Sequence, residues 1–262
     1  MGVDVAMVIL SKEVSPAETN LKQYLFSTWH DLKESKELTG MDNGIAMEIG
    51  QAKVFVISMP GPIPWSELQH LCASSRFWPE AASEIKNHCA HLVVTVIGKL
   101  EPYPASRLLT QVSAAALATC SGALGVYWGN APMVIPKELF IAFATEVLPH
   151  EPPVDIWLDI QIGKVDERFT AGYTSGMTAL GHLEIEVENS PESPSDLYER
   201  IKALAWYLIK NGPVIADGDT FGEDAKERIR VRFSDSFLRR PEKVMRLEYE
   251  KSTPANPWWR RK

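Results

Sequence analysis

The chain has 262 residues, with 27 Lys and Arg against 34 Asp and Glu, and its net charge is −7. This length allows one large domain or two small ones and can bury a core without a disulfide or metal. Three cysteines without regular spacing, no basic leader and no apolar run of roughly 20 residues predict a soluble, cytoplasmic protein with no membrane contact.

The first 150 residues predict strands alternating with helices. Apolar runs and period-two alternation indicate strands at 5–10, 45–49, 53–59, 91–98 and 124–128. Helical spacing indicates helices at 16–26, 65–72, 78–88, 106–119 and 136–143. We expect Ser15 to cap the first helix and Gly50-Gln51 to turn a hairpin between the second and third strands.

The remainder of the chain predicts a second group of elements after a proline-rich linker at 149–153. Strands are expected at 154–165, 169–180, 183–188 and 229–233. A long helix follows the third of these strands, with Ser195 or Asp196 as its cap and Asn211-Gly212-Pro213 at its end.

This uneven alternation, with hairpins in both halves, favours the α+β class with mixed sheets and packed helices. The predicted organisation is an N-terminal α/β lobe at 1–150 and a C-terminal α+β lobe at 151–262 that ends in a basic tail. The two lobes can be drawn with the same element order, so a diverged duplication and one continuous domain both stay open as alternatives.

Two clusters could hold a metal. His88 and His91 stand three residues apart, and Asp217 and Asp219 flank a glycine. If the four side chains converged, they could support metal-assisted hydrolysis. The simpler interpretation gives His88 and His91 backbone contacts at a helix-to-strand junction and makes Asp217 and Asp219 turn residues.

An acidic strip is predicted on the strand at 183–188. At strand spacing Glu184, Glu186 and Glu188 project from one face, opposite Leu183, Ile185 and Val187. Further carboxylates follow at Glu192, Asp196 and Glu199. The strip is either a solvated sheet face or a recognition surface for a basic partner, and we take these six residues as the candidate partner-binding set.

The charge is distributed unevenly along the sequence. Residues 226–262 contain 12 basic and 5 acidic residues, and residues 1–225 contain 15 basic and 29 acidic residues. An acidic body repels nucleic acid and attracts basic proteins, so nucleic acid is not the expected partner. The basic end, with Trp258 and Trp259, balances charge or touches phosphates.

Familiar catalytic signatures are absent from the sequence. It contains no Gly-x-Ser-x-Gly elbow, no Gly-Lys-Ser/Thr phosphate loop, no Gly-x-Gly-x-x-Gly fingerprint and no His-Glu-x-x-His. We therefore predict no catalytic residue and no cofactor.

Several segments resemble an uncharacterised bacterial family, domain-of-unknown-function family 4261. The resemblance rests on residues 59–64, 78–79, 87–94, 125–128, 181–186 and 211–220. It implies a bacterial cytosolic protein without an assigned activity. It also implies an association with secreted antibacterial effectors, such as those of type VI secretion, for which the neighbouring protein is an immunity protein.

Together these observations predict a non-enzymatic immunity protein that binds and neutralises a cognate, basic effector protein. A nuclease is one such effector, because its basic cleft accepts an acidic surface in place of phosphate. The metal-assisted hydrolase with His88, His91, Asp217 and Asp219 is the alternative. The sequence leaves the oligomeric state open.

Overall fold

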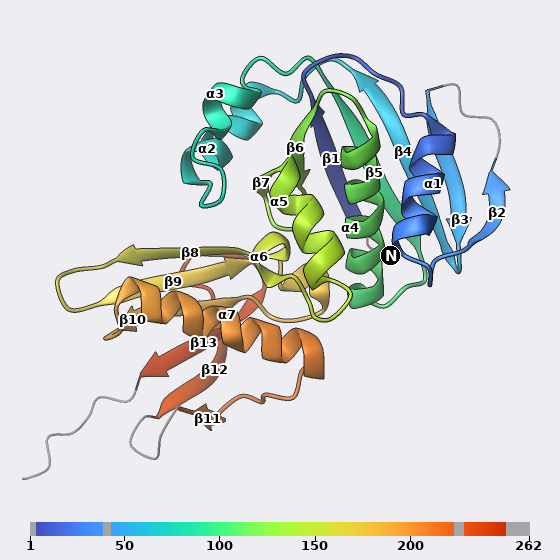
Figure 1. Ribbon diagram of the computed structural model, residues 1–262. Coiled ribbons are helices and arrows are strands. Elements are labelled where there is room, and N and C mark those ends of the chain that lie inside the picture. The colour runs from blue at the N-terminus through green and yellow to red at the C-terminus, as the bar shows by residue number, and fades with distance from the viewer. Residues whose placement is uncertain (1–3, 39–42, 223–227, 250–262) are drawn as a thin grey trace, which may run out of the picture. The chain divides into compact units, whose positions relative to one another are not determined.

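The computed structural model describes residues 4–38, 43–222 and 228–249, which form two compact units (Figure 1). Unit 1 comprises Met1–Asp159 and Ser175–His182, and unit 2 comprises Ile160–Thr174 and Leu183–Lys262. Both units combine sheets with helices, so the predicted α+β class is confirmed. The tail with Trp258 and Trp259 lies outside the described residues.

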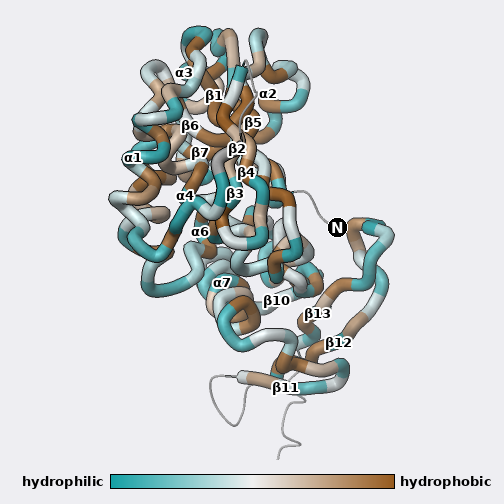
Figure 2. The backbone as a smooth tube through the Cα atoms, turned by 90° about the vertical axis from the view of Figure 1, so that its right-hand side faces the viewer, coloured by the Kyte–Doolittle hydropathy of each residue, from teal (hydrophilic) through white to brown (hydrophobic). Residues whose placement is uncertain are grey.

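Unit 1 is built on a seven-stranded sheet in the order β2-β3-β4-β5-β1-β6-β7, and its neighbouring strands run antiparallel. The strands are β1 (Asp4–Leu10), β2 (Glu34–Leu38), β3 (Gly44–Ile49), β4 (Ala52–Pro60), β5 (Ala90–Gly98), β6 (Ala123–Trp128) and β7 (Met133–Pro136). The apolar runs that predicted strands lie at the centre of this sheet, and Figure 2 shows them among the most hydrophobic segments.

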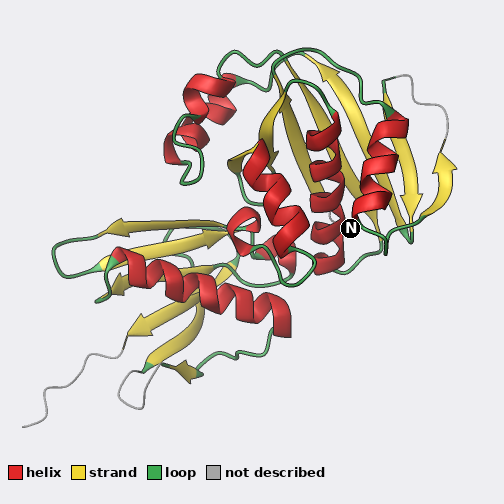
Figure 3. Ribbon diagram, in the orientation of Figure 1, coloured by secondary structure: helices red, strands yellow, loops and turns green. Residues whose placement is uncertain are grey.

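Helices cover both faces of the unit 1 sheet (Figure 3). They are α1 (Glu18–Thr28), α2 (Trp65–Ser74), α3 (Ala81–Ile85), α4 (Pro102–Thr119) and α5 (Lys137–Ala142). Strand alternation explains this: Val8 faces α4, whereas Ile9 points the other way into a cluster with α2 and α3. Gly125 permits that packing, because a Cβ there would lie 2.5 Å from the Trp78 ring.

Short elements complete unit 1. They are a π-helical turn (η1, Phe143–Val147), α6 (Val154–Trp157) and a 3₁₀ turn (η2, Thr178–Leu180). The indole Nε1–H of Trp157 donates to Thr110 Oγ1 on α4 at 2.8 Å, and both side chains are buried. The strand expected at 154–165 is therefore wrong in its first four residues, which form a helical turn held by this contact.

Unit 2 is a six-stranded mixed sheet in the order β11-β12-β13-β10-β9-β8. Its elements are β8 (Asp159–Lys164), β9 (Thr170–Ser175), β10 (Ile185–Ser190), α7 (Pro194–Asn211), β11 (Thr220–Phe221), β12 (Ile229–Asp235) and β13 (Lys243–Tyr249). β10 and β13 pair in parallel. The apolar stripe of α7, including Leu197, Ile201 and Leu208, is buried, and Gly172 of β9 brings the sheet close to Ile201.

Two predicted helix caps are wrong. α1 begins after Ala17 with no side-chain cap, and α7 is capped by Ser193 rather than by Ser195 or Asp196. Strands β2, β7, β11 and β13 are additional to those predicted. None of the described helices combines the length and apolar character that a membrane-spanning segment requires.

Candidate functional site

The predicted acidic strip does not form a solvated face, because two of its three carboxylates are buried. Glu184 is 6% exposed and Glu186 is 0% exposed. Thr174 Oγ1 donates to Glu184 Oε2 at 2.7 Å. Ser236 Oγ and Phe237 N donate to the Glu186 carboxylate at 2.5 and 2.9 Å. The turn after β12 therefore covers the face that alternation alone assigned to solvent.

Glu188 is the member of the strip that stays on the surface. Its side chain is 55% exposed, and Oε2 lies 3.8 Å from Arg246 Nη1 on the neighbouring strand β13. A surface pair at this distance contributes little to stability. Of the three strip residues, Glu188 is the one exposed enough to contact a partner.

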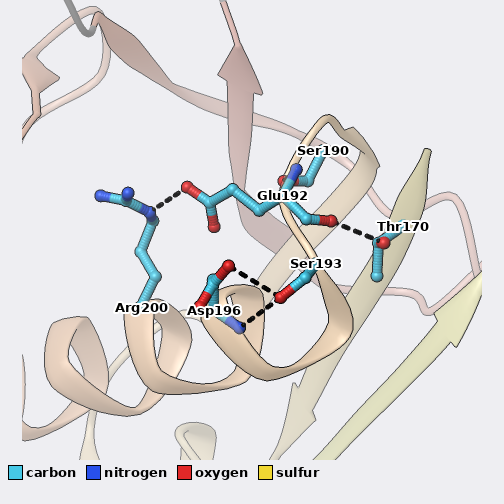
Figure 4. A network of polar contacts seen from close by, with 6 residues as sticks. All are labelled: Thr170, Ser190, Glu192, Ser193, Asp196 and Arg200. Carbon is cyan, nitrogen blue, oxygen red and sulfur yellow. Dashed lines mark hydrogen bonds and ion pairs between the residues drawn. The ribbon is translucent and has the colours of Figure 1, made fainter. Parts of the chain in front are cut away.

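The three carboxylates beyond the strip lie at the start of α7, and two of them stabilise local structure (Figure 4). Ser193 Oγ accepts from the Asp196 backbone N–H at 3.2 Å and donates to Asp196 Oδ2 at 2.7 Å. Glu192 Oε1 pairs with Arg200 Nε at 2.5 Å, with both side chains less than 15% exposed. Asp196 and Glu199 are exposed, so the predicted set retains three surface members with Glu188.

Both ring nitrogens of His88 bond to backbone groups, so the side chain has no lone pair left for a metal. Its Nε2 accepts from the Ile63 backbone N–H at 2.8 Å, so the proton is on Nδ1, which donates to Ile85 O at 2.7 Å. His91 Nδ1 lies 3.1 Å from Gly61 O. Burial lowers the pKa of His91, and the nearby His88 adds to this lowering while the hydrogen bond to Gly61 opposes it.

Asp217 and Asp219 organise a turn. Asp219 Oδ2 accepts from the Ala216 backbone N–H and Asp217 Oδ1 from the Phe233 backbone N–H, both at 2.8 Å. Gly218 between them has φ +91°, which side-chain-bearing residues rarely adopt. His88 and His91 belong to unit 1 and the two aspartates to unit 2. Among the described residues no three His, Cys, Asp or Glu side chains gather as metal ligands.

Unit 1 contains a cavity of about 630 Å³ that the sequence did not predict. Asp4, Lys99, Asn130 and Thr178 supply its polar lining. Burial raises the pKa of the Asp4 carboxyl, and the hydrogen bond that Asn130 Nδ2 donates to Asp4 Oδ1 at 2.8 Å opposes this rise. The carboxyl group is thus held in one orientation at the cavity wall.

A second cavity in unit 1, of about 480 Å³, lies between α4 and the β3–β4 turn. Tyr103, Arg107 and Gln111 line it from α4, four residues apart. This spacing places three polar side chains on one helix face and is the signal for the cavity that the sequence offers. The signal led to no prediction because Tyr103 and Gln111 belong to no known motif, and the small residues of the helix indicated close packing instead.

Residues 173–248, from β9 to β13, match the family model of a domain of unknown function (DUF4261), which confirms the resemblance for this segment. The motifs at 59–64, 78–79, 87–94 and 125–128 lie outside the matched residues. No curated protein and no solved structure matches the chain.

Proposed function

We propose that this chain is a non-enzymatic immunity protein that binds and neutralises a cognate antibacterial effector with a basic surface, for example a nuclease of a type VI secretion system. The observation that carries the proposal is the charge of the two units. Unit 1 has 10 Lys and Arg against 17 Asp and Glu, and unit 2 has 17 of each. The whole net charge of −7 therefore belongs to unit 1.

This charge distribution supports a surface of unit 1, rather than the predicted acidic strip, as the one that meets the effector. Glu184 and Glu186 are buried within unit 2, whereas the excess of acidic over basic residues lies in unit 1. Glu67 on α2 and Glu80 just before α3 are two exposed acidic residues of unit 1. A net negative field over one unit steers a basic partner and accelerates its association.

The first test is capture from a lysate of the source organism with the tagged full-length chain as bait. The proposal expects one stoichiometric protein of basic composition that stays bound at moderate salt. Its toxicity to cells, and the relief of that toxicity by this chain, would establish neutralisation. An eluate without a basic protein would contradict the proposal.

Charge-reversal variants then locate the surface. Glu67→Lys with Glu80→Lys changes the net charge of unit 1, and Glu188→Lys with Glu199→Lys makes the same change on unit 2. With the captured effector, the unit 1 pair is expected to slow association by about tenfold or more at low salt. A larger effect of the unit 2 pair would place the interface on unit 2, near Glu188 and Glu199. Equal rates for all variants would exclude electrostatic recognition.

A further inference from the structure

The cavity beside α4 contains a buried polar group without a partner. Gln111 is 1% exposed, and its Nε2 has no hydrogen-bond partner among the described residues. Native proteins satisfy nearly all such groups, because an unpaired buried donor is costly. The residue lines a cavity of about 480 Å³, which is within the size range of small-molecule sites. An acceptor supplied by a ligand would satisfy this donor.

The groups around Gln111 are mainly hydrogen-bond donors. Arg107 is one helical turn earlier on α4, and among the described residues only Asp31 accepts from it, through Nη2 at 3.0 Å. Four of the five guanidinium N–H groups therefore have no acceptor within the described part of the protein. Tyr103 is one turn earlier again. Burial raises the pKa of its hydroxyl, and the Arg107 charge opposes the rise, so the phenol keeps its proton and can donate.

The walls between these donors are apolar. Leu32, Ile49, Leu100 and Leu108 line the cavity, and the Tyr103 ring, held at 77° to the Trp157 ring with centroids 5.4 Å apart, contributes a rigid surface. Two cations, Lys33 and Arg107, outnumber the single anion Asp31 in the lining. The first turn of α4, at Tyr103 and Pro104, adds the positive end of a helix dipole. The site therefore combines apolar walls with a positively charged side that is rich in hydrogen-bond donors.

We propose that this cavity binds a small organic carboxylate with an aromatic or aliphatic body. Arg107 pairs with the carboxylate, Gln111 Nε2 donates to one of its oxygens, and the leucine and tyrosine walls hold the body. The cavity lies entirely within unit 1, and the inference is independent of the effector proposal. A ligand here would make unit 1 a sensor or carrier of a metabolite, whichever partner the protein has.

The test uses the full-length chain with two probes, 3-phenylpropanoate and its neutral amide, 3-phenylpropanamide. Binding is measured by calorimetry and by chemical-shift changes in amide NMR spectra. We expect saturable binding of the carboxylate and binding of the amide that is weaker by about tenfold or more, because the amide lacks the charge that Arg107 recognises. The shifted amides are expected in α4 and at Gly50 and Gln51.

Two variants separate the site from the fold. Gln111→Leu removes the buried donor with little change in volume, and Arg107→Met removes the half-buried charge at the surface. Each is expected to weaken carboxylate binding by about tenfold or more. The matched controls Gln69→Leu and Arg76→Met change residues of unit 1 that do not line the cavity, and should leave the affinity unchanged. Absence of saturable carboxylate binding, equal affinity for the amide, or unchanged affinity in both site variants would overturn the proposal.

Discussion

The Ser236 hydroxyl donates a hydrogen bond of 2.5 Å to the buried carboxylate of Glu186, which lies 50 residues earlier in the sequence. The backbone N–H of Phe237 donates to the other carboxylate oxygen at 2.9 Å. A single glutamate on β10 thus fixes the turn that follows β12. A side chain expected at a partner surface instead stabilises the fold of unit 2.

Replacing Glu186 with alanine is expected to lower the free energy of unfolding by about 2–3 kcal/mol, because it leaves two buried donors without an acceptor. Glu186→Gln keeps one acceptor oxygen and should lose about half as much. Urea denaturation followed by circular dichroism measures both changes. Glu188→Ala, on the same strand but exposed, should stay within about 0.5 kcal/mol of the original chain. Equal losses at 186 and 188 would contradict the buried role of Glu186.

The cap of α7 gives a second prediction with a matched control close by. Ser193→Ala removes the acceptor of the Asp196 backbone N–H and is expected to cost about 1 kcal/mol of unfolding free energy. Hydrogen exchange at the Asp196 amide should become faster in the same variant. Ser195→Ala alters an exposed serine that makes no capping bond, so its stability should change little. If Ser195→Ala proved the more destabilising, the cap assignment would be wrong.

Strongly patterned elements of the fold could be predicted from the sequence. The hairpin of β3 and β4 turns at Gly50, whose φ is +59°, and the strand at 91–98 and the helix at 106–119 agree with β5 and α4. The polar edge strand β2 was missed because pairing with β3, rather than an apolar pattern of its own, makes it a strand. β7 is apolar but was missed because it is only four residues long.

The candidate site was harder to predict because alternation assigns a side chain to a face without saying what covers it. Glu184 and Glu186 do point away from Ile185 and Val187, but a turn about 50 residues later in the sequence closes over Glu186. Likewise, no local pattern reveals that His88 bonds to the backbone of Ile63. The four-residue spacing of Tyr103, Arg107 and Gln111 does predict a polar face on α4. The cavity beside that face also needs the β3–β4 turn, which no local pattern places there.

Stability is expected to fall on acidification partly through His91. Burial lowers the pKa of His91 below its ordinary value of 6.5, so the unfolded chain takes up the proton more readily than the folded one. The resulting stabilisation is complete above the unfolded pKa and is lost as the pH falls through and below that value. We expect the unfolding free energy of His91→Asn to change less between about pH 7.5 and about pH 5 than that of the original chain.

The matched control for this experiment is His70→Asn, which makes the same replacement at an exposed histidine of α2. Urea titrations at each pH give the difference. An identical slope in His91→Asn and the original chain would show that His91 protonates equally well in the folded and unfolded states. His182, whose pKa burial also lowers, accounts for part of the slope that persists in the variant.

Two adjacent residues of α4 are expected to respond in opposite directions to removal of their polar groups. Thr110 accepts from Trp157 Nε1, so Thr110→Val leaves a buried indole N–H unpaired and should cost about 1–3 kcal/mol. Gln111 Nε2 has no hydrogen-bond partner among the residues that the structure describes, so Gln111→Leu should stabilise the ligand-free chain by up to about 1 kcal/mol. Urea denaturation of both variants in the absence of any carboxylate measures the two changes in the free energy of unfolding. If Gln111→Leu were as destabilising as Thr110→Val, the amide would have a structural partner, and the proposed carboxylate site would lose its buried donor.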